Sequence, residues 1–561
     1  MNPIWRATGL MVFGVLMAFT GVAWGQWDIP SIRNAIRTQI EGEGHPSQMT
    51  VCDNQIHCLV VLPLFYEQRD YRPAWIGEDG ISPNALALVK AIEGASQEGL
   101  APSDYHLEDI RKMVSGDFFS NSPGGFVEPG ELAEMDIFLT DAFLLYGSHL
   151  LAGRVDPIKL DPLWQADRRK ADLVQILEDA LAGKQVEAAL QSLLPPHVEY
   201  QKLRQALGRY QEMARKGGWG RIPEGTRLKA GERGKEVLLL RERLTAEGFL
   251  LPDQEKADME LFDPALKQAL LNYQAEHGLE PDGVPGKRTI ACLNTPVEAR
   301  VRQIAVNMER CRWLSHDLGA RHVRVNIAGF RLDVMENGRS VMHMRVIAGK
   351  PFHNTPVFSD RITYLVMNPS WEVPPSIART KILPKARKDK NFLRSQGFRV
   401  SSGWGDKRES IDPDSVDWKQ ITPSTLRYRF TQDPGPLNSL GRVKFMFPNQ
   451  FQVYLHDTPE KDLFAKAIRD FSSGCIRVEK PVDLAEYLLK NHPQWPRDRV
   501  LSVLTGEERE TYTVIIPDPI PIHILYCTVW VDDSGLVHFG PDIYQGDILL
   551  DRALNEPARA S

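Results

Sequence analysis

One histidine and one cysteine in this chain have the chemistry and the spacing of a nucleophile with its base. His456 and Cys475 lie close together in the sequence. A cysteine attacks as its thiolate, and an imidazole within hydrogen-bond reach can take the thiol proton and later give it to a leaving group. Gly474 tolerates unusual dihedral angles, so the amides of Gly474 and Cys475 could bind a carbonyl oxygen as an oxyanion hole. These residues predict acyl transfer through a covalent intermediate.

The segment around this pair contains the elements needed to bring the two side chains together. Apolar residues alternate at Phe451, Val453 and Leu455, which predicts a strand that ends at the histidine. Residues 461–468 predict a helix, after which a loop returns to the cysteine. These elements can place both side chains at one edge of a sheet. The competing interpretation is an ordinary loop in which a half-buried cysteine and histidine are inert.

Three stretches together give the chain a family resemblance. It reads Tyr-Leu-His-Asp-Thr-Pro at 454–459, Phe-Ser-Ser-Gly-Cys-Ile-Arg-Val at 471–478 and Asn-Pro-Ser-Trp-Glu-Val-Pro-Pro at 368–375. These motifs resemble the L,D-transpeptidases of bacterial cell-wall synthesis. The family signature is a His, a spacer of this order, and Ser-His-Gly-Cys followed by an apolar residue and Arg or Asn. Ser473 departs from the usual second His, and in this it is similar to the large periplasmic members of the family.

The resemblance implies a role for each residue of the motifs. It makes Cys475 the nucleophile and His456 the general base, with the imidazole oriented by the backbone carbonyl of Asp457. It implies substrate contacts from the remaining motif residues, which are Asn368, Trp371, Tyr454, Ser473 and Arg477. A structural role is the competing interpretation for three of these residues: sheet packing for Tyr454, an ion pair within the loop for Arg477, and core packing for Trp371.

The reaction that the resemblance implies is peptidoglycan cross-linking. The thiolate attacks the carbonyl that joins the third and fourth residues of a tetrapeptide stem, D-alanine leaves, and an amine of a second stem opens the thioester to form a 3→3 cross-link. Carbapenems are expected to acylate the same cysteine. The alternatives are an L,D-carboxypeptidase or cross-link hydrolase, a lipoprotein-to-wall attachment enzyme, and a non-catalytic peptidoglycan-binding protein. No metal or organic cofactor is expected.

Composition excludes several other classes of protein. A chain of 561 residues is too long for one hydrophobic core, so about two to four domains are expected. The net charge of −6 gives no indication of a nucleic-acid partner. The cysteines and histidines lack the paired spacing of a structural zinc site. The expected partners are peptidoglycan stem peptides and glycan strands, and the resemblance adds other cell-wall synthases.

Residues 1–25 predict an export segment. Residues 10–24 are almost wholly apolar, follow Arg6 and end in Ala-Trp-Gly at 23–25, which is typical of a signal peptide and indicates a periplasmic location. An uncleaved N-terminal membrane anchor is the alternative, because the cleavage pattern is imperfect. In an oxidising compartment Cys52 and Cys58 could form a disulfide bond.

The remaining chain predicts a multidomain α+β protein. Residues 26–220 predict a helical domain without recognisable chemistry, which resembles the scaffold of large L,D-transpeptidases. Residues 226–296 place helices on both sides of the turn Pro-Asp-Gly-Val-Pro-Gly at 281–286, and they resemble a small three-helix peptidoglycan-binding domain. This domain either binds glycan or acts as a spacer. Residues 297–316 predict a linking helix.

Residues 317–545 predict a β-rich catalytic domain, with a C-terminal tail at 546–561. Alternating apolar residues predict strands at 322–327, 330–335, 341–347, 364–367, 426–430, 441–447, 452–455, 501–504, 511–516, 522–531 and 536–539, with a type I′ hairpin turn at 336–339. An insert at about 376–423 interrupts this pattern and begins with Arg379, Lys381, Lys385, Arg387, Lys388 and Lys390. The insert is either a solvated helical face or a mobile, positively charged cap, and the resemblance favours the cap.

Overall fold

The computed structural model describes residues 27–42, 49–51, 54–115, 127–165, 168–251, 258–403 and 408–556. The chain divides into two compact units. The first comprises the described residues up to Glu93 with Tyr105–Tyr146 and Asp172–Gln191, and the second comprises the others. Residues 1–25 and Cys52 lie outside the described residues, so the signal segment stays a prediction. The expected disulfide bond of Cys58 is not formed, because Cys58 has a free, buried thiol that donates to the Asp141 carbonyl over 3.9 Å. Within the described ranges, no helix has the length and apolar character needed to cross a bilayer.

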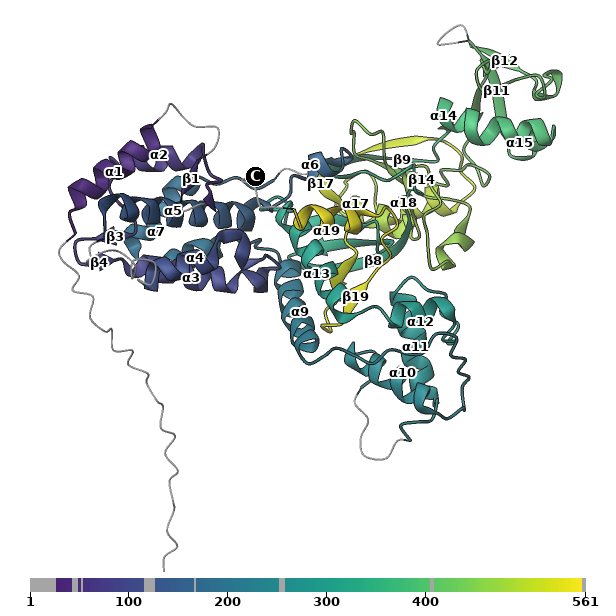
Figure 1. The fold of residues 1–561 in the computed structure, drawn as a ribbon. Helices are drawn as coiled ribbons and strands as arrows, with labels where there is room; N and C mark the ends of the chain where they lie inside the picture. The colour runs from purple at the N-terminus through teal and green to yellow at the C-terminus, as the bar shows by residue number, and fades with distance from the viewer. Residues whose placement is uncertain are drawn as a thin grey trace, which may run out of the picture. The chain divides into compact units, whose positions relative to one another are not determined.

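The first unit is mainly helical, as the sequence predicted (Figure 1). Its helices are α1 (Ile29–Glu41), α2 (Val61–Gln68), α3 (Pro83–Glu93), α4 (Leu107–Ser115), the first part of α5 (Pro129–Ala152), α7 (Leu173–Gly183) and α8 (Val186–Ser192). Two short hairpins accompany them, β1 (Thr50–Val51) with β2 (Asn54–Gln55) and β3 (Ile76–Gly77) with β4 (Gly80–Ile81). Helix α5 is apolar on all sides and buried, and its Asp136 is buried because it accepts hydrogen bonds from the Tyr66 hydroxyl and the Ala74 and Trp75 amides.

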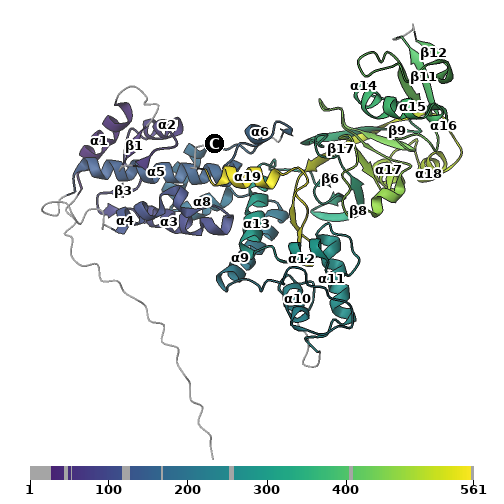
Figure 2. The ribbon, with the colours of Figure 1, turned by 45° about the vertical axis from the view of Figure 1, so that its right-hand side comes forward.

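The second unit contains a small three-helix part, seen at the lower right of Figure 2. Its helices are α10 (Lys235–Ala246), α11 (Pro264–Glu276) and α12 (Lys287–Leu293), which enclose a core of their own. The buried Gln274 side chain organises the Pro-Asp-Gly turn: its amide nitrogen donates to Asp282 and Val284, and its oxygen accepts from the Gly283 amide. The predicted helical arrangement around this turn is confirmed.

A closed β-sheet forms the centre of the second unit. Its strands are β6 (Arg321–Asn326), β7 (Arg331–Glu336), β8 (Arg339–Ile347), β9 (Val357–Met367), β14 (Val443–Met446), β15 (Leu455–His456), β16 (Ile476–Val478) and β17 (Tyr512–Leu525), with β5 (Trp164–Gln165) added to β9. The order β14-β15-β16-β8-β7-β6-β17-β9 closes on itself because β9 also pairs with β14. Closure leaves these strands without a free edge and encloses a continuous apolar core.

Helices surround this sheet and complete the second unit. They are α6 (Pro157–Leu160), α9 (Val198–Arg215), α13 (Val297–Arg312), α17 (Pro481–Leu489), α18 (Arg497–Thr505) and α19 (Gly546–Leu554), and a hairpin of β18 (Val529–Val531) and β19 (Val537–Phe539) packs with α9 and α13. The predicted turn between β7 and β8 is confirmed, since Asn337 and Gly338 have φ angles of 49° and 78°.

The predicted insert is a subdomain with its own sheet and core. Its sheet has the strand order β10 (Trp371–Glu372), β13 (Arg429–Gln432), β11 (Phe398–Ser402) and β12 (Glu409–Ile411). The helices that share its core are α14 (Pro375–Ile377), α15 (Leu383–Lys388) and α16 (Phe392–Ser395). We call residues 371–432 the cap. It extends beyond the predicted limits of 376–423, because its sheet is completed by strands on both flanks.

Three local predictions were wrong. Residues 501–504 belong to helix α18 and not to a strand, since a short apolar run fits either element. Residues 461–468 contain only a short 3₁₀ helix, Lys461–Ala465. The expected tail at 546–561 begins with helix α19, whose Leu550 is fully buried in the core of the sheet.

Candidate active site

Adjacent strands bring the predicted histidine and cysteine together. Strands β15 and β16 pair in parallel, with His456 opposite Arg477, and the Ile476 amide donates to the Tyr454 carbonyl over 3.1 Å. Cys475 directly precedes β16. Since alternate residues of a strand share a face and registered neighbours lie side by side, the side chains of Tyr454, His456, Cys475 and Arg477 share one face.

The imidazole of His456 has a defined tautomer. Its Nδ1 lies 2.5 Å from the Asp457 carbonyl oxygen, as the resemblance implied. A carbonyl only accepts, so Nδ1 carries the proton and Nε2 has a free lone pair. Burial, with the positive charges of Arg477, Lys444 and Lys461, lowers the pKa of His456 to about 3, although the bond to Asp457 favours protonation. The imidazole is therefore neutral at pH 7.

The Cys475 thiol is protonated in the same surroundings. Burial raises its pKa above the ordinary value, against the opposing effects of hydrogen bonds from Tyr454 and the charges of Arg477 and Lys444. The thiol donates to the Gln452 carbonyl over 3.9 Å and also interacts with the Tyr454 hydroxyl. The Tyr454 ring lies 5.7 Å from the imidazole, centroid to centroid. Tyr454 thus bridges the two candidate reactive groups. A neutral imidazole and a neutral thiol can exchange a proton only as the sulfur attacks.

The carboxylate of Asp457 fixes the loop that orients the imidazole. It is buried, and it accepts hydrogen bonds from the Arg442 amide at 2.8 Å and the Thr458 amide at 2.7 Å, with an ion pair to Lys461. Gly441 has a φ angle of 59°, and a Cβ atom there would lie 2.3 Å from this carboxylate. The side chain therefore positions its own carbonyl group, a role that the sequence did not predict.

The loop before the cysteine is held from several sides. Gly474 has a φ angle of 115°, which favours glycine, and its carbonyl accepts a 2.8 Å hydrogen bond from the buried Thr355 hydroxyl. Its amide donates to Ser472 Oγ over 3.1 Å. This contact corrects the predicted oxyanion hole, because the Gly474 amide already has an acceptor within the loop. Among the residues that the structure describes, the Cys475 amide and the Tyr454 hydroxyl remain as candidate donors to a carbonyl oxygen.

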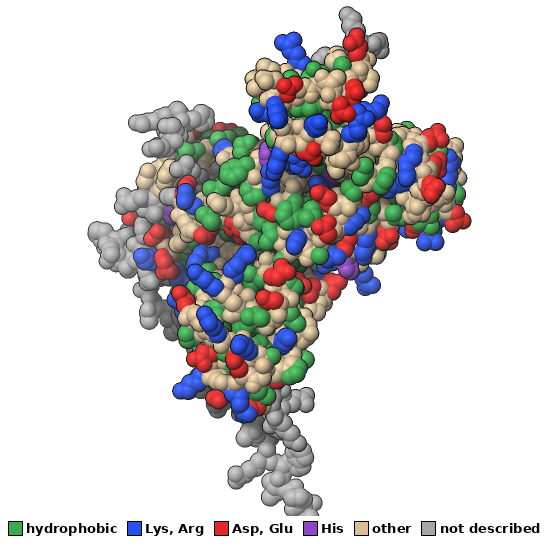
Figure 3. Space-filling view, turned by 90° about the vertical axis from the view of Figure 1, so that its right-hand side faces the viewer, with side chains coloured by type: hydrophobic (Ala, Val, Ile, Leu, Met, Phe, Trp, Pro, Cys, Tyr) green, Lys and Arg blue, Asp and Glu red, His purple; other side chains and the backbone are tan. Residues whose placement is uncertain are grey.

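Ser473 and Arg477, two of the predicted substrate-binding residues, make polar contacts at the site. Ser473 lies at the site and accepts a 2.7 Å hydrogen bond from Lys381 of the cap. Arg477 forms an ion pair with Glu460, which is the structural role considered for it. Figure 3 shows the face where the cap, at the top, meets the rest of the second unit, with Lys and Arg side chains along the boundary.

Trp371 and Asn368 make structural contacts. Trp371 is half-buried and packs against the core of the cap, 6.3 Å from Phe398 between ring centroids, which is the core packing considered for it, and its contact with substrate stays a prediction. Asn368 is buried, and its side-chain amide donates to the Glu508 and Glu510 carbonyls at 3.1 Å each. It fastens a neighbouring segment of backbone through these two hydrogen bonds.

Several residues of this site were missed by sequence reasoning. Lys444 lies opposite His456 on β14, Thr355 supports Gly474, and Lys381 reaches Ser473 from the cap. Thr355 and Lys381 belong to segments remote from the motif in the chain, and Lys444 lies on the preceding strand β14. The only signal available was the positive charge of the insert, which does not single out Lys381.

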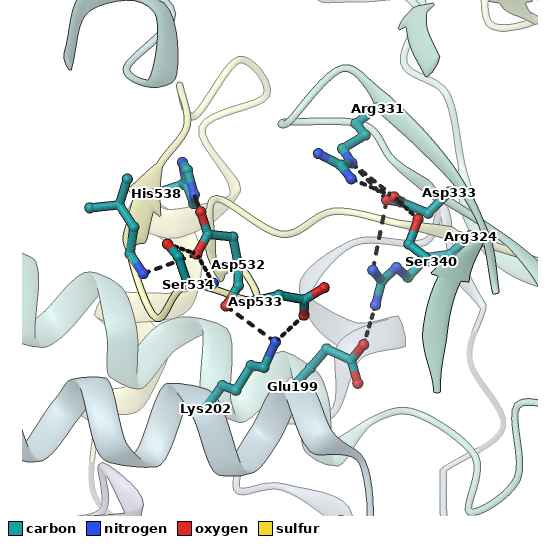
Figure 4. A network of polar contacts seen from close by, with 11 residues as sticks. Glu199, Lys202, Arg324, Arg331, Asp333, Ser340, Asp532, Asp533, Ser534 and His538 are labelled. Atoms are coloured by element: carbon teal, nitrogen blue, oxygen red, sulfur yellow. Dashed lines mark hydrogen bonds and ion pairs between the residues drawn. The ribbon is translucent and has the colours of Figure 1, made fainter. Parts of the chain in front are cut away.

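A second polar network lies at a cavity of about 780 Å³ in the same unit (Figure 4). On one wall His538 contacts Glu276 of α11 at 2.7 Å and Asp532 at 3.0 Å. On another, Asp333 pairs with Arg331 and Arg324. The cavity lining includes Lys466 and Arg469 of the segment between His456 and Cys475, but not the cysteine. It is therefore distinct from the candidate active site.

Three family models match successive parts of the chain. Residues 61–207 match a scaffold domain, residues 233–293 match a domain described as "Putative peptidoglycan binding domain", and residues 320–515 match the L,D-transpeptidase catalytic domain. The last match contains the cap and both candidate reactive residues. The scaffold, peptidoglycan-binding and catalytic assignments made from the motifs are confirmed.

Two known proteins are similar to the chain. A curated protein of Haemophilus influenzae named "Putative L,D-transpeptidase" is 33% identical over 256 residues, which are 46% of this chain and 50% of that protein. The chain thus matches about half the length of this relative. A crystal structure of an L,D-transpeptidase from Xylanimonas cellulosilytica, residues 123–326, shares 14% identity, covers 54% of this chain and 99% of that one, and has a TM-score of 0.17, at which the likeness carries no argument.

Proposed function

Because this chain carries the catalytic domain of the L,D-transpeptidases beside a scaffold domain and a peptidoglycan-binding domain, we propose that it cross-links peptidoglycan stem peptides. The observation that supports this most directly is the neutral His456, fixed through Nδ1 by Asp457, on the strand beside the Cys475 loop. The proposed products are 3→3 cross-links.

The first stage is acylation of Cys475. His456 Nε2 takes the thiol proton as the sulfur forms a bond to the carbonyl carbon between the third and fourth residues of the donor stem. The Cys475 amide and the Tyr454 hydroxyl stabilise the negative oxygen that develops. When the C–N bond breaks, Nε2 returns the proton to the departing amine. D-alanine leaves, and the donor remains as a thioester.

The second stage transfers the donor to an amine. The side-chain amine of the third residue of another stem attacks the thioester carbonyl, and His456 takes the proton that the amine loses. The C–S bond breaks, the thiolate recovers that proton, and a new amide joins the two stems. Residues 233–293 would hold glycan strands near this reaction. A peptidoglycan substrate supports the periplasm as the proposed location. Other cell-wall synthases are proposed partners.

The test is an analysis of muropeptides from purified sacculi incubated with the wild type or with Cys475→Ala. New 3→3 dimers that form only with wild type support transpeptidation. Shortened monomers without dimers would replace the proposal with a carboxypeptidase. No change in folded, reduced protein would instead indicate a non-catalytic peptidoglycan-binding protein. A product joined to an outer-membrane lipoprotein, after that acceptor is added, would assign lipoprotein attachment.

A further inference from the structure

A lysine of the cap reaches the loop that carries the candidate nucleophile. Lys381 lies in the π-helical turn Ala378–Ile382, which is anchored because Ala378 and Ile382 are buried in the cap's own core. Its Nζ atom donates a hydrogen bond of 2.7 Å to Ser473 Oγ. Ser473 is separated from Cys475 only by Gly474. The ammonium group therefore lies beside the place where the scissile carbonyl must bind.

Other cations converge on this point. Lys381 is half-buried, and its pKa is lowered by burial and then by the charges of Lys350 and Arg477, with Glu460 acting in the opposite direction. Arg477 already pairs with Glu460, whose side chain is 58% exposed. Arg477 Nε is buried and lacks a hydrogen-bond partner within the part of the chain that the structure describes. The Lys350 amide donates to the Ser472 carbonyl over 3.2 Å, which places Lys350 beside the same loop. Since Glu460 pairs with Arg477, an additional anion would be stabilised by Lys381 and Lys350.

A donor stem provides an anion at the required distance. The residue that leaves carries a free α-carboxylate one residue beyond the scissile carbonyl, and successive Cα atoms are about 3.8 Å apart. With the carbonyl at Cys475, that carboxylate falls within reach of an ammonium group held at Ser473. The Ser473 hydroxyl is an uncharged acceptor, so it positions the ammonium group without neutralising it.

We propose that Lys381, together with Lys350 and Arg477, forms a subsite for the C-terminal carboxylate of the donor stem. This inference rests on the proposed function and specifies its substrate: the bond that is broken must be the last peptide bond of the donor. The cap thereby takes part in substrate selection, because it supplies the central cation of the subsite. Ammonium and guanidinium groups bind carboxylates through charge-assisted hydrogen bonds, and neither binds a neutral carboxamide as strongly.

Two donors that differ only at this group test the proposal. A tetrapeptide stem that ends in D-alanine and the same stem that ends in D-alaninamide have the same scissile bond, and kcat/KM is measured for each from release of the last residue. The wild type should prefer the carboxylate by about tenfold to about a hundredfold. Lys381→Met retains a long side chain for packing but lacks the charge, so it should lose most of this preference by slowing only the carboxylate donor.

Two further variants make the result specific. Lys388→Met removes an exposed lysine of the same cap, in the last turn of α15, and should keep the full preference. Lys381→Arg keeps the positive charge and should retain most of the preference for the carboxylate donor. This variant provides a second test of the charge if Lys381→Met unfolds.

The outcomes separate this inference from the proposed function. Equal turnover of the two donors by the wild type would overturn the carboxylate subsite and leave transpeptidation intact. A full preference retained in folded Lys381→Met would likewise overturn the role of Lys381. Turnover of neither donor by the wild type would overturn the proposed function, and the subsite with it.

Discussion

At the scale of residues, the proposed reaction depends on a histidine that is kept neutral. Burial and the charges of Arg477 and Lys444 lower the pKa of His456 to about 3, while Nδ1 donates to Asp457. The Cys475 thiol has a raised pKa. The resting site is therefore expected to contain a thiol and a neutral imidazole, and not a thiolate–imidazolium pair.

This state predicts an unusual dependence of activity on pH. His456 loses its function as a base only when it becomes protonated, so the acid limb of kcat/KM should lie well below the value of about 6.5 of an ordinary imidazole. We expect kcat/KM for a tetrapeptide donor to change little between about pH 7 and about pH 5. Circular dichroism at each pH controls for unfolding. An acid limb near 6.5 would show that His456 titrates as an ordinary imidazole and would contradict the lowered pKa.

The hydroxyl of Tyr454 gives a second prediction. Tyr454→Phe keeps the ring that packs beside His456 but removes the donor to Cys475, so acylation should slow by about tenfold, the contribution of one hydrogen bond. The acylation rate is measured by intact mass after rapid mixing with donor. Tyr487→Phe removes a hydroxyl that bonds Glu336 elsewhere in the unit, and should leave the rate unchanged. An unaltered rate in Tyr454→Phe would assign that side chain to sheet packing alone.

At the scale of elements, the turn before β14 and the loop after β15 fit together around Asp457. Its carboxylate binds the Arg442 and Thr458 amides, and Gly441 leaves the space it needs. The imidazole is oriented by the carbonyl of the same residue, so a disturbance at Gly441 should reach His456.

Gly441→Ala tests this coupling. The new Cβ atom would lie 2.3 Å from the carboxylate, so we expect a loss of about 1–3 kcal/mol in the free energy of unfolding and a larger fractional loss of activity than of folded protein. Gly535→Ala is the matched control, since it has a φ angle of 85° and open space around its Cβ position. Denaturant unfolding and activity are measured for both variants. Equal losses of stability and activity in Gly441→Ala and Gly535→Ala would mean that the strain of a positive φ angle alone accounts for the losses.

Sequence patterns predicted elements well where the decisive contacts are local. The turn at Asn337 and Gly338 was predicted because its signal lies within a few residues. The limits of the cap were not, because β10 pairs with β13, a strand far along the chain. Helix α18 was mistaken for a strand because its apolar run is short.

At the scale of the whole molecule, the second unit joins its three-helix part to the β18–β19 hairpin through His538. Burial disfavours a charge on this imidazole, but its contacts with Glu276 and Asp532 outweigh burial and raise its pKa above 6.5. A group whose pKa is raised by folding stabilises the folded state at pH values below its unfolded pKa. This stabilisation is lost as the pH rises through the pKa of the folded state. The junction should therefore weaken in alkaline solution.

Glu276→Gln tests this junction. We expect a stability loss of about 0.5–1 kcal/mol near pH 6, because the partner carboxylate is 41% exposed, and a smaller loss near pH 9, where His538 is neutral. Thermal unfolding of wild type and variant at both values measures the difference. Glu280→Gln changes an exposed acid just after α11 and should show no such dependence. A loss independent of pH would contradict a protonated His538.

The candidate site could be predicted only in part from the chain. The motif supplied Cys475, His456, the Asp457 carbonyl and Tyr454, which lie in or beside two paired strands. Thr355, Lys444 and Lys381 come from other segments, and only the closed sheet and the cap bring them to the loop. Local periodicity contains no information on such distant contacts.

Whether Cys475 carries the donor as a thioester is measured by the mass of the protein after mixing with a tetrapeptide stem. We expect a gain equal to the donor without its terminal D-alanine, located by peptide mapping on Cys475, in the wild type and not in Cys475→Ala. Folded, reduced wild type that shows no such gain on rapid quenching, or an adduct on another residue, would contradict this expectation.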